Sequence, residues 1–211
     1  MFTTKTAFAA AFLLATTAPM FAGDLYLGAS VGQASSSFSR SDFSAGGADS
    51  GVTTSYDEED TAFKIFLGYE INEFLAIEGG YADFGSPSVN YDIYGGQTPY
   101  TTKAAVETDA WFIAAKGTYA INEKFEVFGK LGLSNNRFVE NYTSSLDIPE
   151  AGGPGASSST KTDVYYGVGV QYNTASPISF VAEYENFGEF GDNSTGRADV
   201  DMFSIGVVYN F

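Results

Sequence analysis

The sequence predicts an all-β protein, an eight-stranded antiparallel transmembrane β-barrel preceded by a cleavable signal peptide. Eight stretches alternate apolar with small or polar residues, the period of two that a β-strand requires. Glycine, with 24 residues, and aromatic residues, at 16%, are both abundant. Short and long connections also alternate along the chain. The clearest stretch is the last, 200–211, one face of which is wholly apolar: Phe203, Ile205, Val207, Tyr209 and Phe211.

The first 22 residues form a separate segment. Lys5 lies in a short polar start, and an Ala-rich apolar run follows it. This is the layout of a secretory signal peptide, with cleavage expected between Ala22 and Gly23. A short membrane anchor is the alternative, but the run is shorter than the ~20 apolar residues that a spanning helix needs. The predicted domains are therefore the signal peptide, 1–22, and the barrel domain, 23–211.

Seven earlier stretches share the alternation of the last one. They cover Leu25–Gln33, Ala62–Ile71, Phe74–Phe84, Asp109–Ile121, Phe125–Ser134, Asp163–Tyr172 and Ile178–Phe187. Short, Asn-led turns suited to hairpins lie at 72–73, 122–124 and 173–177. Long loops rich in Ser, Gly, Asp and Thr are expected near 36–60, 85–106 and 136–161, with a shorter one at 188–197. An even number of strands then places both termini on the short-turn side.

Alternation alone does not say which face points outward, because a soluble ligand-binding barrel has the same period. Lipid outside is favoured because the apolar faces carry aromatic residues at both ends, as interfacial girdles do. These residues are Trp111 and Tyr119, Tyr166 and Tyr172, and Phe203 and Tyr209. The opposite faces mix glycine with large rings, which suits a narrow lumen filled by side chains. Most stretches also have about the 9–11 residues that cross a bilayer.

With lipid outside, charged side chains point into the lumen. They are Lys64, Glu70, Glu78, Lys116, Glu126, Lys130, Glu183 and Glu185. Buried charges of one sign would be prohibitive, but lysines facing glutamates can pair in a network. Two interpretations stay open at this point: a static ion-pair plug that fills the lumen, and a gated path for ions.

Short Gly- and Tyr-rich motifs recur along the strands. They include Leu67-Gly-Tyr-Glu-Ile-Asn, Ile77-Glu-Gly-Gly-Tyr, Gly167-Val-Gly-Val-Gln-Tyr and the closing Ser204-Ile-Gly-Val-Val-Tyr-Asn-Phe. In their order and spacing, residues 23–211 resemble the transmembrane-barrel family of outer membrane protein A and its small, opacity-type relatives. The resemblance implies an eight-stranded barrel in a bacterial outer membrane, with its termini in the periplasm and mobile surface loops. The peptidoglycan-binding domain of the larger members is not expected here.

The resemblance also implies roles for particular residues. It places Glu78, Lys116, Lys130 and Glu183 at positions that carry charged interior residues in the family, whereas Val181 stands where the family's interior gate has a basic residue. The closing strand resembles the signal that the outer-membrane insertion machinery reads, with Phe203, Tyr209 and Phe211 as its aromatic residues.

Composition excludes several classes of function. The chain has no His and no Cys, so it lacks the commonest general base and any thiolate. The enzymes among the barrels of this membrane generally use His, so no enzymatic activity and no cofactor are expected. With 26 acidic against 10 basic residues, a net charge of -16 repels nucleic acid. The acidic run Asp57–Asp60 is expected to be a solvated loop face, with binding of a divalent cation as the alternative.

The sequence therefore predicts an integral outer-membrane barrel with a structural or surface-interaction role and at most narrow-pore permeation. One alternative is a porin-like diffusion channel for small solutes or ions, and another is an adhesin that binds partners through its long loops. The expected partners are outer-membrane lipid, the insertion machinery and a surface ligand at the loops. The chain is expected to be a monomer.

Overall fold

The computed structural model describes residues 25–38, 51–55, 59–85, 88–94, 100–144, 156–192 and 196–211. The predicted signal peptide, its cleavage site at Ala22 and Gly23, and residues 57 and 58 of the acidic run lie outside these residues. Within the described ranges, no helix is long and apolar enough to cross a membrane.

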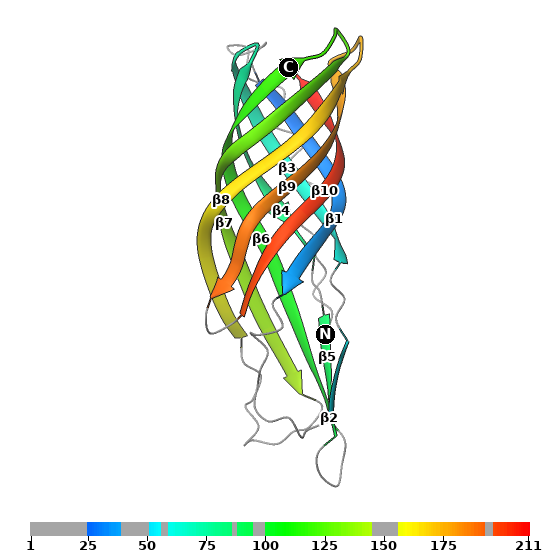
Figure 1. Cartoon of the computed structure of the whole chain (residues 1–211), viewed down its shortest axis with the longest axis vertical. Coiled ribbons are helices and arrows are strands. Elements are labelled where there is room, and N and C mark those ends of the chain that lie inside the picture. The colour runs from blue at the N-terminus through cyan, green and yellow to red at the C-terminus, as the bar shows by residue number, and fades with distance from the viewer. Residues whose placement is uncertain are drawn as a thin grey trace.

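Eight antiparallel strands close into a barrel whose strands tilt around its long axis (Figure 1). They are β1 (Leu25–Phe38), β3 (Glu59–Asn72), β4 (Leu75–Asp83), β6 (Tyr100–Ala120), β7 (Phe125–Ser144), β8 (Ala156–Asn173), β9 (Ile178–Asp192) and β10 (Gly196–Asn210). Each pairs with the next in this order, and β10 pairs back with β1. The predicted fold class is confirmed.

The barrel closes where the last strand meets the first. The register runs from Tyr26 opposite Asn210 to Phe38 opposite Ala198. The backbone N–H of Phe211 continues the ladder by donating to the carbonyl of Leu25 at 3.1 Å. Closure removes the sheet edges whose unpaired peptide groups would be costly in lipid. The carboxyl terminus lies at the short-turn end, opposite the end where β2 and β5 lie (Figure 1).

The expected long loops are partly strand, so that expectation was wrong in its extent. Strands β6 and β7 stay in register from Thr102 opposite Ser144 down to Ala120 opposite Glu126. Two short strands, β2 (Gly51–Ser55) and β5 (Ser88–Tyr94), extend the sheet beyond the barrel along β6. Thr, Val and Tyr in these segments favour strands. Their polar composition marks the point where the sheet leaves the membrane, not the point where it ends.

The apolar faces of the strands point outward, as lipid outside requires. Trp111, Tyr119 and Leu131 are among the most exposed large side chains, at 64%, 70% and 65%. Val208 and Met202, which lie on the other face of β10, are buried at 1% and 0%. The predicted girdle residues are all on the outside: Trp111, Tyr119, Tyr166, Tyr172, Phe203 and Tyr209.

Large rings enter the lumen because glycines stand opposite them. Phe66 is paired with Gly28, and Tyr26 with Gly68, on the neighbouring strands β3 and β1. A Cβ added at Gly28 would lie 2.1 Å from Cζ of Phe66, and one at Gly68 would lie 2.0 Å from Cζ of Tyr26. Each ring therefore occupies the volume that a side chain opposite it would need, and the lumen is packed instead of open.

Candidate functional site: the filled lumen

Six charged side chains meet in the middle of the barrel and define a charge network. They are Lys64, Glu78, Lys116, Lys130, Glu183 and Glu185. They come from β3, β4, β6, β7 and β9, and each lies on the inward face of its strand. Three lysines against three glutamates make the network neutral, and each side chain is at most 7% exposed.

Lys130 lies at the centre of the charge network. Its Nζ is 2.6 Å from Oε2 of Glu78 and 2.7 Å from Oε1 of Glu183. Lys64 forms a second centre, 2.6 Å from Glu185 and in contact with Glu183. Both ammonium groups also lie 4.9 Å from the centre of the Phe66 ring, which faces them with its electron-rich surface. These two lysines have no exposed side-chain surface.

Lys116 is held more loosely than the other two lysines. Its Nζ is 3.6 Å from Glu78 and donates to Oε1 of Gln171 at 3.3 Å. The rings of Phe128 and Tyr26 lie 4.5 Å and 5.1 Å from it. It is on the short-turn side of the network, and its side chain is 7% exposed. Lys116 is therefore the network cation that solvent approaches most closely.

Two tyrosine hydroxyls complete the shell around the carboxylates. Tyr26 donates to Oε1 of Glu78 at 2.8 Å, and Tyr165 donates to Oε1 of Glu185. Both tyrosines are buried, at 2% and 0%. A buried carboxylate needs several hydrogen bonds or ion pairs to offset the loss of water. Glu78 and Glu185 each have a hydrogen bond from a tyrosine and an ion pair with a lysine.

The other two predicted lumen charges lie outside this cluster. Glu70 is exposed at the short-turn end of β3. Glu126, which is half-buried near the same end, accepts a hydrogen bond from the side-chain amide of Asn173 at 2.8 Å. Both follow the inward period of their strands but stand where the strands reach the mouth of the barrel. Val181, which the resemblance places where the family's interior gate has a basic residue, is buried at 4%.

A cluster of rings fills the lumen on the long-loop side of the charge network, and we call it the aromatic stopper. It consists of Phe84, Phe112, Tyr165, Phe187 and Phe190. Neighbouring ring centres are 4.8 to 6.0 Å apart, the usual spacing of packed aromatic pairs. All five side chains are at most 5% exposed. A chain of packed rings therefore separates the charge network from the loop end.

A β-bulge in β9 completes the stopper. Phe84, Phe112, Tyr165 and Phe187 follow the inward period of their strands, whereas Phe190 does not. Asp199 pairs with Glu189 while Asp201 pairs with Asn186, so Phe187 and Gly188 together face one residue of β10. Gly188 has a φ of 74°, a value that favours glycine. The extra residue shifts the period of β9, so that Phe190 enters the lumen as Phe187 does. The sequence signal for this bulge is Gly188, a glycine inside a strand and two residues before Phe190.

The bulge is fixed by two side chains of β7. Oγ of Ser134 and Nδ2 of Asn136 donate to the carbonyl of Phe187 at 2.6 and 2.7 Å. Both residues are 1% exposed. The peptide group that the bulge removes from the ladder is thereby satisfied inside the lumen.

The arrangement offers ion pairing and packing but no evident catalytic pair. In the part of the chain that the structure describes, no group of three or more acidic residues could hold a metal ion. Of the acidic run at 57–60, for which cation binding is the alternative, residues 57 and 58 lie beyond that part. The carboxylates of the lumen are each committed to lysines or tyrosines.

The apolar exterior, the closed eight-stranded sheet and the packed lumen define a small transmembrane barrel of a bacterial outer membrane. The chain belongs to the family described as the OmpA-like transmembrane domain, whose model matches residues 21–211. Outer membrane protein A of Serratia marcescens is 27% identical over 148 residues, which are 69% of this chain and 38% of that protein. The match thus spans well under two thirds of that relative.

Solved structures show the same fold. OprG from Pseudomonas aeruginosa is 14% identical, with a TM-score of 0.53, over 90% of this chain and 96% of that chain. Neisserial surface protein A is 20% identical, with a TM-score of 0.51, over 89% of this chain and 97% of that chain. At this level of identity the likeness concerns the fold alone.

Proposed function

We propose that the protein is a non-enzymatic barrel with a permanently plugged lumen, which anchors an extended sheet and its loops at the membrane surface for contact with a surface ligand. The observation that carries this proposal is the position of Lys130. It is fully buried and within 2.7 Å of both Glu78 and Glu183. A continuous path for ions would have to break both pairs and also pass the aromatic stopper.

The energetic cost of breaking the pairs argues for a static plug over a gate. Leaving a buried charge without its partner costs about 3–5 kcal/mol. An opening cost of about 4 kcal/mol leaves the open state populated about once in a thousand molecules. The stopper adds a second barrier, because its five rings fill the lumen from β6, β8, β9 and the residue that follows β4.

The surface role is supported by the length of the strands. Strands β6, β7 and β8 have 21, 20 and 18 residues, about twice the number needed to cross the bilayer. Together with β2 and β5, they carry the sheet past the apolar belt (Figure 1). A rigid sheet of this kind would hold the connecting segments at a distance from the lipid.

The proposal includes the orientation and assembly of the barrel. The short-turn end with both termini would face the periplasm, and the chain would act as a monomer. The strip formed by Phe203, Tyr209 and Phe211 would be the signal for the insertion machinery. The rings of Tyr209 and Phe211 lie 5.1 Å apart on the outer surface, where another protein could reach them.

A solute-efflux measurement tests the plug. Vesicles that contain the refolded protein should retain an entrapped small sugar as long as vesicles without protein do. Rapid efflux would instead support the porin-like alternative.

A cell-binding assay tests the surface role. Cells that display the intact chain should bind extracellular matrix or host cells better than cells that display a variant with residues 145–155 replaced by a short Gly-Ser linker. Equal binding would argue against the adhesive role.

A further inference from the structure

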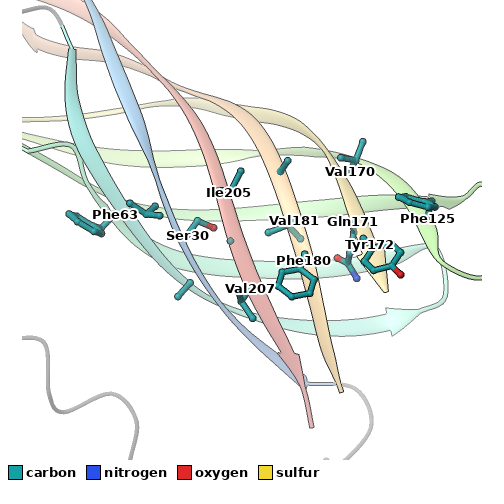
Figure 2. Close-up of a pocket in the computed structure, with 14 residues that line it drawn as sticks. Ser30, Phe63, Phe125, Val170, Gln171, Tyr172, Phe180, Val181, Ile205 and Val207 are labelled. Atoms are coloured by element: carbon teal, nitrogen blue, oxygen red, sulfur yellow. The ribbon is translucent and has the colours of Figure 1, made fainter. Parts of the chain in front are cut away.

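A groove crosses the outer wall of the barrel within its lipid-facing belt. It has a volume of about 760 Å³ and reaches from Phe63 on β3 to Phe125 on β7. In Figure 2, Ile205 and Val170 lie along one side of it, and Val207, Phe180 and Tyr172 along the other. Ser30, Val181 and Gln171 lie between the two sides.

The strand register explains how the groove arises. One side is a row of paired residues across β1, β10, β9 and β8: Val31, Ile205, Ala182 and Val170. The other side is the next outward row: Ala29, Val207, Phe180 and Tyr172. The rows are two residues apart along each strand, about 7 Å. Each contains one alanine among large side chains, so each side has a gap where only a methyl group stands.

The chemistry of the groove admits hydrocarbon only. Between the two rows the groove floor is backbone. The side chains there point into the lumen, at Ser30, Val181 and Gln171, and Gly206 has none. Their strands are paired on both sides, which leaves no peptide group for a ligand. The side chains along both sides are aliphatic or aromatic. The exposed fraction of the large ones runs from 37% at Tyr172 to 60% at Ile205.

The direction of the groove indicates which end of a lipid it takes. Phe63 is near the long-loop end of β3, whereas Phe125 is the first residue of β7 and packs on Tyr172 with ring centres 5.0 Å apart. The groove therefore descends toward the short turns. Lys124, which is exposed, stands at that end, next to Phe125. A cation at the edge of the belt attracts a phosphate headgroup.

We propose that this groove holds one acyl chain of a phospholipid whose phosphate lies beside Lys124. A second copy of the protein fits the groove less well. In a two-fold dimer centred on this groove, a hollow would face an identical hollow instead of a ridge that fills it. A flexible methylene chain fills the gaps at Ala29 and Ala182, and each methylene group gains contacts there that a flat wall cannot give.

Native mass spectrometry of the purified barrel with added phosphatidylglycerol tests the proposal. Ala182→Phe closes the groove, and Ala115→Phe is the matched control, since Ala115 is an exposed, lipid-facing alanine on β6 between Ile77 and Leu131. The wild-type protein and the control should retain one phospholipid per barrel. Ala182→Phe should retain about tenfold less, because the ring displaces about two methylene groups. Lys124→Gln should also reduce retention.

Each other result overturns the proposal. Equal retention in both alanine variants, or equal loss in both, would mean that the lipids form an unselective annulus. A wild-type dimer that Ala182→Phe dissociates would make a second copy the occupant. Unchanged retention of phospholipid by Lys124→Gln would show that the phosphate does not lie beside Lys124. Circular dichroism checks folding of every variant, and Ala29→Leu fills the same groove if Ala182→Phe does not fold.

Discussion

Nζ of Lys130 and Oε2 of Glu78 lie 2.6 Å apart, with neither side chain exposed. The two residues come from β7 and β4, which are separated in the sheet by β6. Their ion pair therefore crosses the lumen instead of following one pair of strands. Lys64 on β3 and Glu183 on β9 form a second such bridge, and Lys130 also contacts Glu183. The two bridges thus join strands that are not neighbours in the barrel wall.

Replacing Lys130 by Met should destabilise the barrel strongly, because Glu78 and Glu183 would then share one fewer cation. The expected loss is about 3–5 kcal/mol in the free energy of unfolding, measured by urea titration in lipid vesicles. Lys116→Met should cost less, since Lys116 is 3.6 Å from Glu78 and nearer to solvent. The double variant Lys130→Met with Glu183→Gln should recover part of the loss. Equal effects of the two single lysine variants would contradict the central place of Lys130.

Replacing Gly28 by Ala should destabilise the barrel by about 1–3 kcal/mol, the usual cost of overpacking a core. The new methyl group would lie 2.1 Å from the Phe66 ring, and that ring is packed against Lys64 and Lys130. Gly117→Ala is the control, because nothing lies within 4 Å of its added Cβ. The same urea titration compares the two variants. A Gly28→Ala protein as stable as Gly117→Ala would show that the lumen is loosely packed.

Alternation in the sequence was enough to predict the barrel and most inward charges, because a strand in a closed wall exposes one face to lipid and the other to the lumen. Lys64, Glu78, Lys116, Lys130, Glu183 and Glu185 all follow this period. Their pairing could not be read from it. Register and shear decide which inward residues share a level of the lumen, and a sequence period does not contain either quantity.

Three features could not be predicted from the period, for related reasons. Glu70 has the inward period but stands at the mouth, since the period says nothing about depth along the axis. In the aromatic stopper only Phe190 departs from the period, because the extra residue at Phe187 and Gly188 reverses the alternation within β9. The outer ends of β6 and β7 fall in the predicted loops, because polar residues replace apolar ones where the sheet leaves the lipid, although the strand pairing continues.

The proposed orientation predicts the reactivity of single cysteines on intact cells. A cysteine in place of Ser158, on the loop side of β8, should react with a membrane-impermeant maleimide. One in place of Glu123, in the short turn between β6 and β7, should react only after the outer membrane is opened. The chain has no native Cys, so the maleimide can label only the cysteine that is introduced into it. Labelling of Glu123→Cys with protection of Ser158→Cys would reverse the orientation.

Deletion of Phe211 should impair assembly more than it impairs the stability of the folded barrel. The residue adds one backbone hydrogen bond to Leu25 and extends the outward aromatic strip. A truncated chain should accumulate in the periplasm, as measured by fractionation and protease sensitivity. Phe211→Tyr, which keeps a ring, should assemble nearly as well as the wild-type protein. Full membrane yield of the truncated chain would place the assembly signal elsewhere.

The central claim is that the charge network and the aromatic stopper close the lumen permanently. Single-channel recording of the refolded protein in planar bilayers tests this claim most directly. We expect no steady conductance, because an ion would have to displace Lys130 from two carboxylates 2.6 and 2.7 Å away and then cross packed rings. A stable, ohmic current from the wild-type protein that disappears in protein-free bilayers would contradict it.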